Sequence, residues 1–122
     1  MVVWLPERKV AISGDVAFHQ RLLPVFEETD TAAWIESWDA FAALGAEIIV
    51  PGHGDPTTIE PLTQYTVGYL KHMRKLIGAL VEAGGTLQDA YQVDQSAYAH
   101  LDAYDELARI NAGRVFRAME FE

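Results

Sequence analysis

Two stretches decide the fold: VAISGD at residues 10–15 and IIVPGHG at residues 48–54. Each begins with small or β-branched apolar residues and ends on a glycine followed by a polar residue, as expected of a short strand that runs into a turn. Between them, residues 31–45 carry Trp34 and Trp38 on an apolar stripe at helical spacing. A helix between two strands predicts that the strands are parallel neighbours.

The flanking sequence extends this unit in both directions. Residues 2–5, VVWL, predict a further strand, joined to residues 10–13 by a four-residue hairpin loop, Pro6–Lys9. After residue 54, apolar periodicity predicts three more helices, over residues 57–83, 86–91 and 102–119. The order β-β-α-β-α-α-α predicts an α/β fold, in which a small mixed sheet is covered by helices on one face. Since the strands are apolar on both faces, something else should cover the other.

Three local expectations refine this picture. Gly14-Asp15 should end the second strand, and residues 16–29 should be irregular. Asp30 or Thr31 is a suitable N-cap for the helix that follows. Thr57 and Glu60 have the spacing of a capping box and should open the long helix.

Composition limits the classes of function. The 122 residues are 50% hydrophobic, which predicts one packed domain, residues 1–122. The net charge of −9 disfavours general nucleic-acid binding and anionic membrane surfaces. The chain contains no cysteine, which excludes disulfides, thiolate catalysis and cysteine-ligated zinc. No apolar run is long enough to span a membrane and the first residues do not resemble a signal peptide. We therefore expect a cytoplasmic protein.

Asp15 and His53 are the candidate metal ligands. Each comes at the end of a predicted strand, and the carboxyl ends of parallel strands meet at one edge of a sheet, where ligand sites are common. A carboxylate and an imidazole are suitable ligands for zinc or a similar divalent ion. The alternative is that both are ordinary turn residues. His19 follows Asp15 in the next loop and is a candidate to orient substrate or to supply a third ligand.

The remaining polar candidates favour structural roles. His72 lies in a charged run on the long helix and is expected on its solvated face. His100 lies near acidic residues in a predicted surface loop. Asp55, beside His53, is expected to cap or turn the chain, and Trp34 and Trp38 are expected in the core.

Residues 3–15, VWLPERKVAISGD, resemble the hairpin and Gly-Asp segment of the metallo-β-lactamase-fold hydrolases. Residues 48–54 resemble the last metal-ligand loop of that family, and a long tyrosine-containing helix followed by GGTL at residues 84–87 is similar to its tail. The resemblance implies half of an αββα sandwich, with Asp15 bridging two metal ions and His53 binding the second. In that family a metal-bound hydroxide attacks a carbonyl or phosphoryl centre.

The family's main signature, His-x-His-x-Asp-His, does not occur in this sequence. The resemblance therefore implies the C-terminal half of the fold, with the N-terminal half that carries this motif absent, and weak or absent zinc binding in this chain. Two ligands do not make the usual site of at least three protein ligands, so we expect a chain that is not catalytically competent alone. Two alternatives remain open: a non-catalytic self-associating module, or one chain of a split hydrolase completed by a partner that carries the missing ligands.

The uncovered sheet face predicts a homodimer. About five apolar side chains from residues 2–5, 10–13 and 48–50 should line this face, and hiding them would contribute on the order of 10 kcal/mol per chain as an upper bound. A patch of that size is rarely left in water. The alternative cover is the final helix, residues 102–119, folded across the same face.

Overall fold

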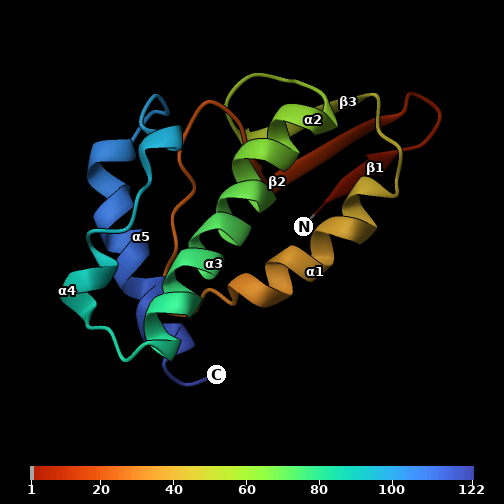
Figure 1. Cartoon of the computed structure of the whole chain (residues 1–122). Coiled ribbons are helices and arrows are strands. Elements are labelled where there is room, and N and C mark those ends of the chain that lie inside the picture. Colours follow the sequence, from red (N-terminus) through yellow and green to blue (C-terminus); the bar gives the residue numbers. More distant parts are fainter. Residues whose placement is uncertain (1) are drawn as a thin grey trace.

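The computed structural model describes residues 2–122 and has the predicted order of elements (Figure 1). Strands β1 (Val3–Leu5) and β2 (Val10–Phe18) form an antiparallel hairpin. Helix α1 (Thr31–Ala42) leads to strand β3 (Ile48–His53), which pairs parallel to β2. The sheet order is β1-β2-β3, so the mixed three-stranded sheet predicted from the sequence is confirmed.

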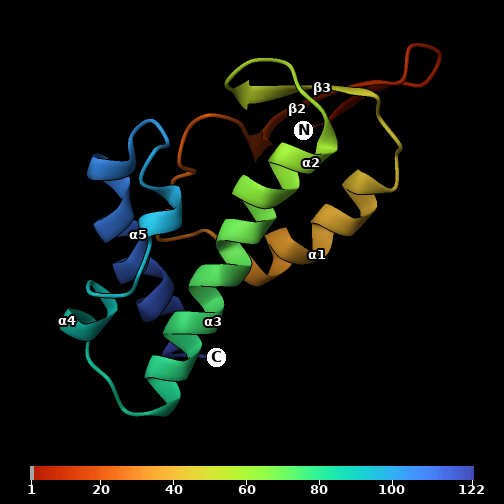
Figure 2. The same ribbon diagram turned by 45° about the horizontal axis from the view of Figure 1, so that its top comes forward.

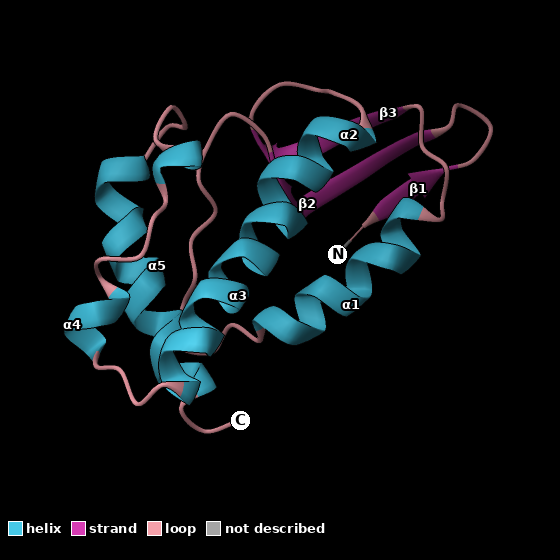
Figure 3. Ribbon diagram, viewed as in Figure 1, coloured by secondary structure: helices cyan, strands magenta, loops and turns pink. Residues whose placement is uncertain are grey.

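The rest of the chain is helical. It comprises α2 (Ile59–Leu62), a π-helical turn η1 (Thr63–Val67), α3 (Gly68–Glu82), α4 (Leu87–Ala90), a short 3₁₀ turn η2 (Ser96–Tyr98) and α5 (Tyr104–Met119). Figures 2 and 3 show the helices on one side of the sheet. None of the helices within residues 2–122 has the length and apolar composition needed to cross a bilayer.

Of the two caps expected from the sequence, the one at Asp30 forms and the one at Thr57 does not, and a capping box that was not predicted forms at α4. The side chain of Asp30 accepts a hydrogen bond from the Ala33 amide, as predicted for the start of α1. Thr86 and Asp89 form a reciprocal capping box at α4. The capping box predicted at Thr57 is wrong, because α2 begins after Thr58, whose side chain makes no capping hydrogen bond.

The second strand is longer than predicted. It continues past Gly14-Asp15 to Phe18, because the chain bulges instead of ending: the register with β3 shifts between Ile12 and Gly14, and again between Gly14 and Phe18. Gly14 has a φ of 55°, which a residue with a side chain rarely adopts and which allows this bulge. Asp15 therefore lies within an irregular strand end rather than after it.

The long helix contains a π-helical turn that holds the end of β2. At Thr66, the buried hydroxyl accepts a hydrogen bond from the Phe18 amide (3.0 Å) and donates one to the Phe18 carbonyl (3.2 Å). The extra residue of a π turn also rotates the helix, so that Tyr69, Met73 and Ile77 become its buried face. Leu76 and Leu80, on the same helix, are only half-buried.

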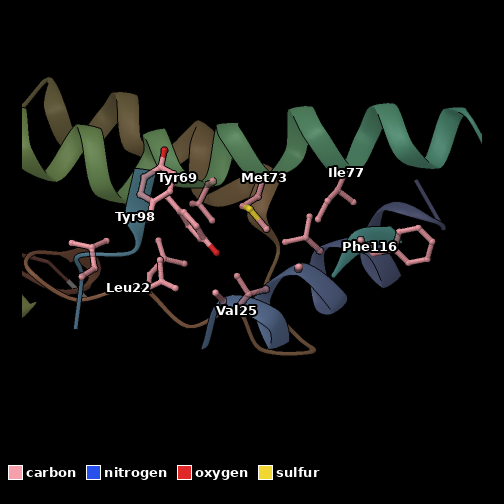
Figure 4. Packing of buried hydrophobic residues seen from close by; sticks show 14 of the residues in the cluster. Leu22, Val25, Tyr69, Met73, Ile77, Tyr98 and Phe116 are labelled. Carbon is pink, nitrogen blue, oxygen red and sulfur yellow. The ribbon is translucent and has the colours of Figure 1, made fainter. Parts of the chain in front are cut away.

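Two apolar clusters stabilise the fold. One lies between the sheet and helix α1 and includes Ile49, Trp38 and Phe41. The other fills the space among the segment after β2, α3 and α5, as Figure 4 shows around Leu22 and Met73. Trp38 is buried, as predicted, and Trp34 is half-buried against the second cluster.

The opposite face of the sheet is uncovered within the described residues. Four apolar side chains on it are exposed: Val3 (43%), Leu5 (38%), Ile12 (40%) and Ile48 (48%). We call these four residues the open sheet face. Helix α5 packs on α3 rather than across this face, so the alternative cover considered from the sequence is wrong.

Candidate functional site

Asp15 and His53 lie at the same edge of the sheet. The bulge after Gly14 turns Asp15 toward the end of β3, where His53 is the last residue of the strand. The distance from Asp15 Oδ1 to His53 Nδ1 is 3.6 Å, too long for a hydrogen bond and short enough for a shared ion or water. The structure therefore confirms the predicted proximity of these two side chains, whereas metal binding by them stays a prediction.

The His53 ring is held by packing. It stacks almost parallel on Phe18, with 5.1 Å between ring centroids and 8° between ring planes. Its Nδ1 is buried and has no hydrogen-bond partner in the described structure, although the side chain as a whole is 40% exposed. An imidazole nitrogen fixed in this way, beside a carboxylate, is available to a ligand or to an ion.

Glycines bring the two loops into contact. A Cβ on Gly52 would lie 2.5 Å from Asp15 Oδ1 and 2.7 Å from the Gly14 backbone. Gly54 has a φ of 95°, and a side chain there would overlap the backbone of His19. The Pro-Gly-His-Gly sequence is therefore needed for the loop to approach Asp15 closely.

The donor set does not fit a metal ion on its own. Among residues 2–122, no group of three or more histidine, aspartate and glutamate side chains is arranged to hold one. Asp15 and His53 supply two donors, and zinc sites in proteins take at least three protein ligands. A metal would need further ligands from outside the described residues.

His19 does not join the pair. Its Nδ1 lies 3.0 Å from the carbonyl oxygen of Asp55, and the Asp55 amide donates to Gln20 Oε1 at 3.1 Å. These contacts hold the loop after β2 against the loop after β3. His19 lines a different depression, shared with His100 and Asp102. Its predicted role as a third ligand is therefore not supported by its position.

The other singled-out histidines are in structural contacts. On α3, Nε2 of His72 lies 2.7 Å from the Asp94 carbonyl oxygen, so this ring ties the helix to the chain before η2. The ring of His100 packs edge-on against Tyr65. A cavity lies beside Asp15 and His53, and neither His72 nor His100 lines it.

That cavity has a volume of about 620 Å³. Its walls come from the end of β2 and the loop after it, from α1, from the end of β3 and from α5, and are largely apolar. Trp34 is fixed in this wall because its indole Nε1 donates a hydrogen bond to the Val16 carbonyl at 2.9 Å. Trp34 thus lines the cavity as well as packing against the core.

Sequence reasoning missed Arg21, which also lines this cavity. Its Nε is buried without a hydrogen-bond partner, and no ion pair among the described residues includes it. One signal was available: Arg21 is the only lysine or arginine between Lys9 and Lys71. A single cation in so long an acidic stretch indicates a specific role.

The fold and the site together define an α/β protein with a carboxylate and an imidazole placed as a candidate metal-ligand pair. Residues 1–53 match the model of the metallo-beta-lactamase superfamily, which is a hydrolase-like and typically metal-dependent family. The matched segment contains all three strands, α1, Asp15 and His53. The resemblance predicted from the sequence is confirmed over these residues, and the similarity suggested for the helical tail stays a prediction. The curated proteins searched include no match to the chain.

Proposed function

We propose that this chain is the C-terminal half of a metallo-β-lactamase-like metal-dependent hydrolase, to which it contributes Asp15 and His53. The observation that carries the proposal is the 3.6 Å separation of the two side chains, in a segment that matches the superfamily model. Two donors hold an ion weakly and leave its remaining positions open. The chain alone therefore does not catalyse hydrolysis, and the missing ligands come from outside the described residues. We place its activity in the cytoplasm, with which a cysteine-free sequence is compatible.

Zinc titration of the purified chain tests the ligand pair. Calorimetry should detect weak binding that is lost in both Asp15→Asn and His53→Gln. Matched controls are Asp55→Asn, in the neighbouring loop, and His72→Gln, on α3, which should both bind as the unsubstituted chain does. Equal binding by all five proteins would refute the assignment of Asp15 and His53.

A hydrolysis assay tests whether the chain is competent alone. With ester, lactam and phosphodiester substrates, the zinc-loaded chain should act no faster than zinc in buffer. Zinc that resists a chelator at one equivalent per chain, or turnover abolished by Asp15→Ala, would show a complete site. Addition of a separate chain carrying His-x-His-x-Asp-His should raise the rate if the hydrolase is split.

The open sheet face favours a second function, self-association with another copy of this chain. Its four side chains are each less than half exposed. Since fully burying an aliphatic side chain contributes about 2 kcal/mol, covering the exposed parts contributes about 3 kcal/mol per chain. This is less than expected from the sequence and, against association costs of about 4–15 kcal/mol, supports a weak dimer only.

Analytical ultracentrifugation across a protein concentration series tests the dimer. We expect a monomer–dimer equilibrium that strengthens with salt, because each chain carries a net charge of −9. Ile12→Lys should abolish the dimer. Ile110→Lys is the matched control, because Ile110 is 46% exposed on α5, away from the sheet. A monomer at every concentration would exclude self-association, and equal loss in both variants would place the contact elsewhere.

A further inference from the structure

The cavity beside the carboxylate–imidazole pair has the size and lining of a small-molecule site. Its volume of about 620 Å³ is in the range of sites for drug-sized ligands. Phe26, Trp34 and Leu107 provide much of its apolar wall. Phe26 is 51% exposed, so part of its ring is open to a ligand.

Arg21 is the cationic group in this lining. A guanidinium keeps its charge at any physiological pH and presents five N–H donors. Its Nε is shielded from water, and the described residues offer it no acceptor. A buried donor without an acceptor is destabilising, and an anion that pairs with the remaining N–H groups of this guanidinium would offset part of that cost.

The negative charges nearby do not cancel this attraction. Asp15 is the carboxylate in the lining, and its side chain is 79% exposed and therefore well solvated. Glu27 and Glu28 lie in the same loop as Arg21, but both are exposed and neither lines the cavity. An anion beside the shielded guanidinium gains more than it loses to a solvated carboxylate, because water screens the latter.

We propose that the cavity binds an organic carboxylate with an aromatic or branched aliphatic body. The carboxylate pairs with Arg21, whose planar fork suits bidentate contact, and the body lies against Phe26 and Trp34. The binding does not depend on the metal-ligand pair. That such a molecule is the substrate of the Asp15–His53 site rests on the proposed function above.

A pair of matched ligands tests the proposal without metal. Calorimetry in the presence of EDTA should show 2-naphthoate binding with a dissociation constant on the order of 0.1–1 mM. The neutral analogue, 2-naphthalenemethanol, should bind at least tenfold more weakly. Because EDTA removes any metal, this result stands or falls independently of zinc binding by Asp15 and His53.

Three variants locate the ligand. Arg21→Met should weaken 2-naphthoate about tenfold and leave the alcohol unchanged, and it should fold because the backbone of Arg21, not its side chain, pairs with Asp102. Arg8→Met, in the exposed hairpin loop, makes the same change of charge and should have no effect. Phe26→Ala should weaken both ligands equally.

Three results would overturn the proposal. The first is that the unsubstituted chain binds the acid and the alcohol with equal affinity. The second is that it binds neither at millimolar concentration. The third is that folded Arg21→Met still prefers the acid to the same extent. The first two need no variant, so the proposal remains testable if Arg21→Met fails to fold.

Discussion

In the helical layer, formed by α3, α5 and the segment after β2, the polar groups of buried side chains form hydrogen bonds with one another. At the sheet edge, by contrast, two buried nitrogen atoms, Arg21 Nε and His53 Nδ1, have no hydrogen-bond partner among the described residues. On α5, Asn111 Oδ1 accepts from the Val25 amide at 2.8 Å and its Nδ2 donates to the Leu23 carbonyl at 2.7 Å. The same Nδ2 donates to the Tyr69 hydroxyl, which donates in turn to Gln95 Oε1 at 2.7 Å.

The apolar surfaces of the two regions differ in the same way. Each of the buried side chains of the helical cluster is at most 9% exposed, while the sheet leaves four aliphatic side chains exposed on one face. Burial raises the pKa of Tyr69 well above its usual range, so its hydroxyl remains a neutral donor within the network. The helical layer therefore pairs its own polar groups and buries its own apolar side chains. The sheet edge leaves polar atoms unpaired and apolar side chains exposed, and these are available to ligands and partners.

Asn111→Ala should have the largest effect on stability. It removes the side-chain partners of the Leu23 carbonyl and the Val25 amide and one partner of Tyr69, and leaves buried groups unpaired. We expect a loss of about 3–5 kcal/mol in the free energy of unfolding, measured by urea denaturation. Gln92→Ala, on the exposed surface, is the control. A loss below about 1 kcal/mol would show that the helical layer does not depend on this network.

The two faces of the sheet should respond differently to the same type of change. Ile49, 1% exposed, faces the helices, and Ile12, 40% exposed, lies on the open face. Ile49→Ala should cost about 3 kcal/mol and Ile12→Ala about 1 kcal/mol, measured for dilute protein. If the chain self-associates, the cost of Ile12→Ala should grow with protein concentration. Equal costs in dilute solution would mean that the open face is covered within the chain.

Gly52→Ala should destabilise the sheet edge by about 1–3 kcal/mol, because the new Cβ meets Asp15 and the Gly14 backbone. Gly84→Ala is the control for backbone strain alone, since Gly84 has a φ of 77° and a methyl group added there would have no neighbour within 4 Å. It should cost about 1 kcal/mol. In a zinc or ligand titration only Gly52→Ala should alter binding at the Asp15–His53 edge.

The sequence predicts the sheet and the proximity of Asp15 to His53 because these follow from local patterns. Alternation, the Gly-Asp and Gly-His-Gly turns, and the rule for a β-α-β unit are sufficient to place both side chains at one edge. The bulge that continues β2 to Phe18 could not be read from the sequence, because it depends on pairing with β3 and on Thr66 from a π-helical turn. Local patterns do not encode such long-range contacts.

The cavity and Arg21 were beyond prediction for a similar reason. The walls come from four separate segments, and the unpaired state of Arg21 depends on which acceptors the fold leaves out of reach. The buried network around Asn111 likewise joins residues more than 80 positions apart in the chain, from Leu23 to Asn111. Charge sparsity around Arg21 was a signal, but it does not indicate where the side chain lies.

The smallest expected effect concerns an ion pair at the edge of the helical layer. Arg74 on α3 donates to both carboxylate oxygens of Glu122, and also to the Thr31 hydroxyl at 2.9 Å. The hydrogen bonds from Arg74 lower the pKa of Glu122 below its usual value. The pKa of Glu122 is therefore lower in the folded protein than in the unfolded chain. The ion pair contributes its full stabilisation at pH values above the unfolded-state pKa. This contribution is lost as the pH falls through the folded-state pKa.

With Glu122 46% exposed, solvent screening limits the contribution to about 0.5 kcal/mol. We expect Glu122→Gln to lower the free energy of unfolding by this amount at pH 7 and by less at pH 3, with urea denaturation at both values as the measurement. Glu120→Gln, whose partner Arg117 is 60% exposed, should change less at either pH. If Glu122→Gln lowers the free energy of unfolding equally at both pH values, its effect comes from packing against Arg74 rather than from charge. The stability of the helical layer would then not depend on acid at this edge.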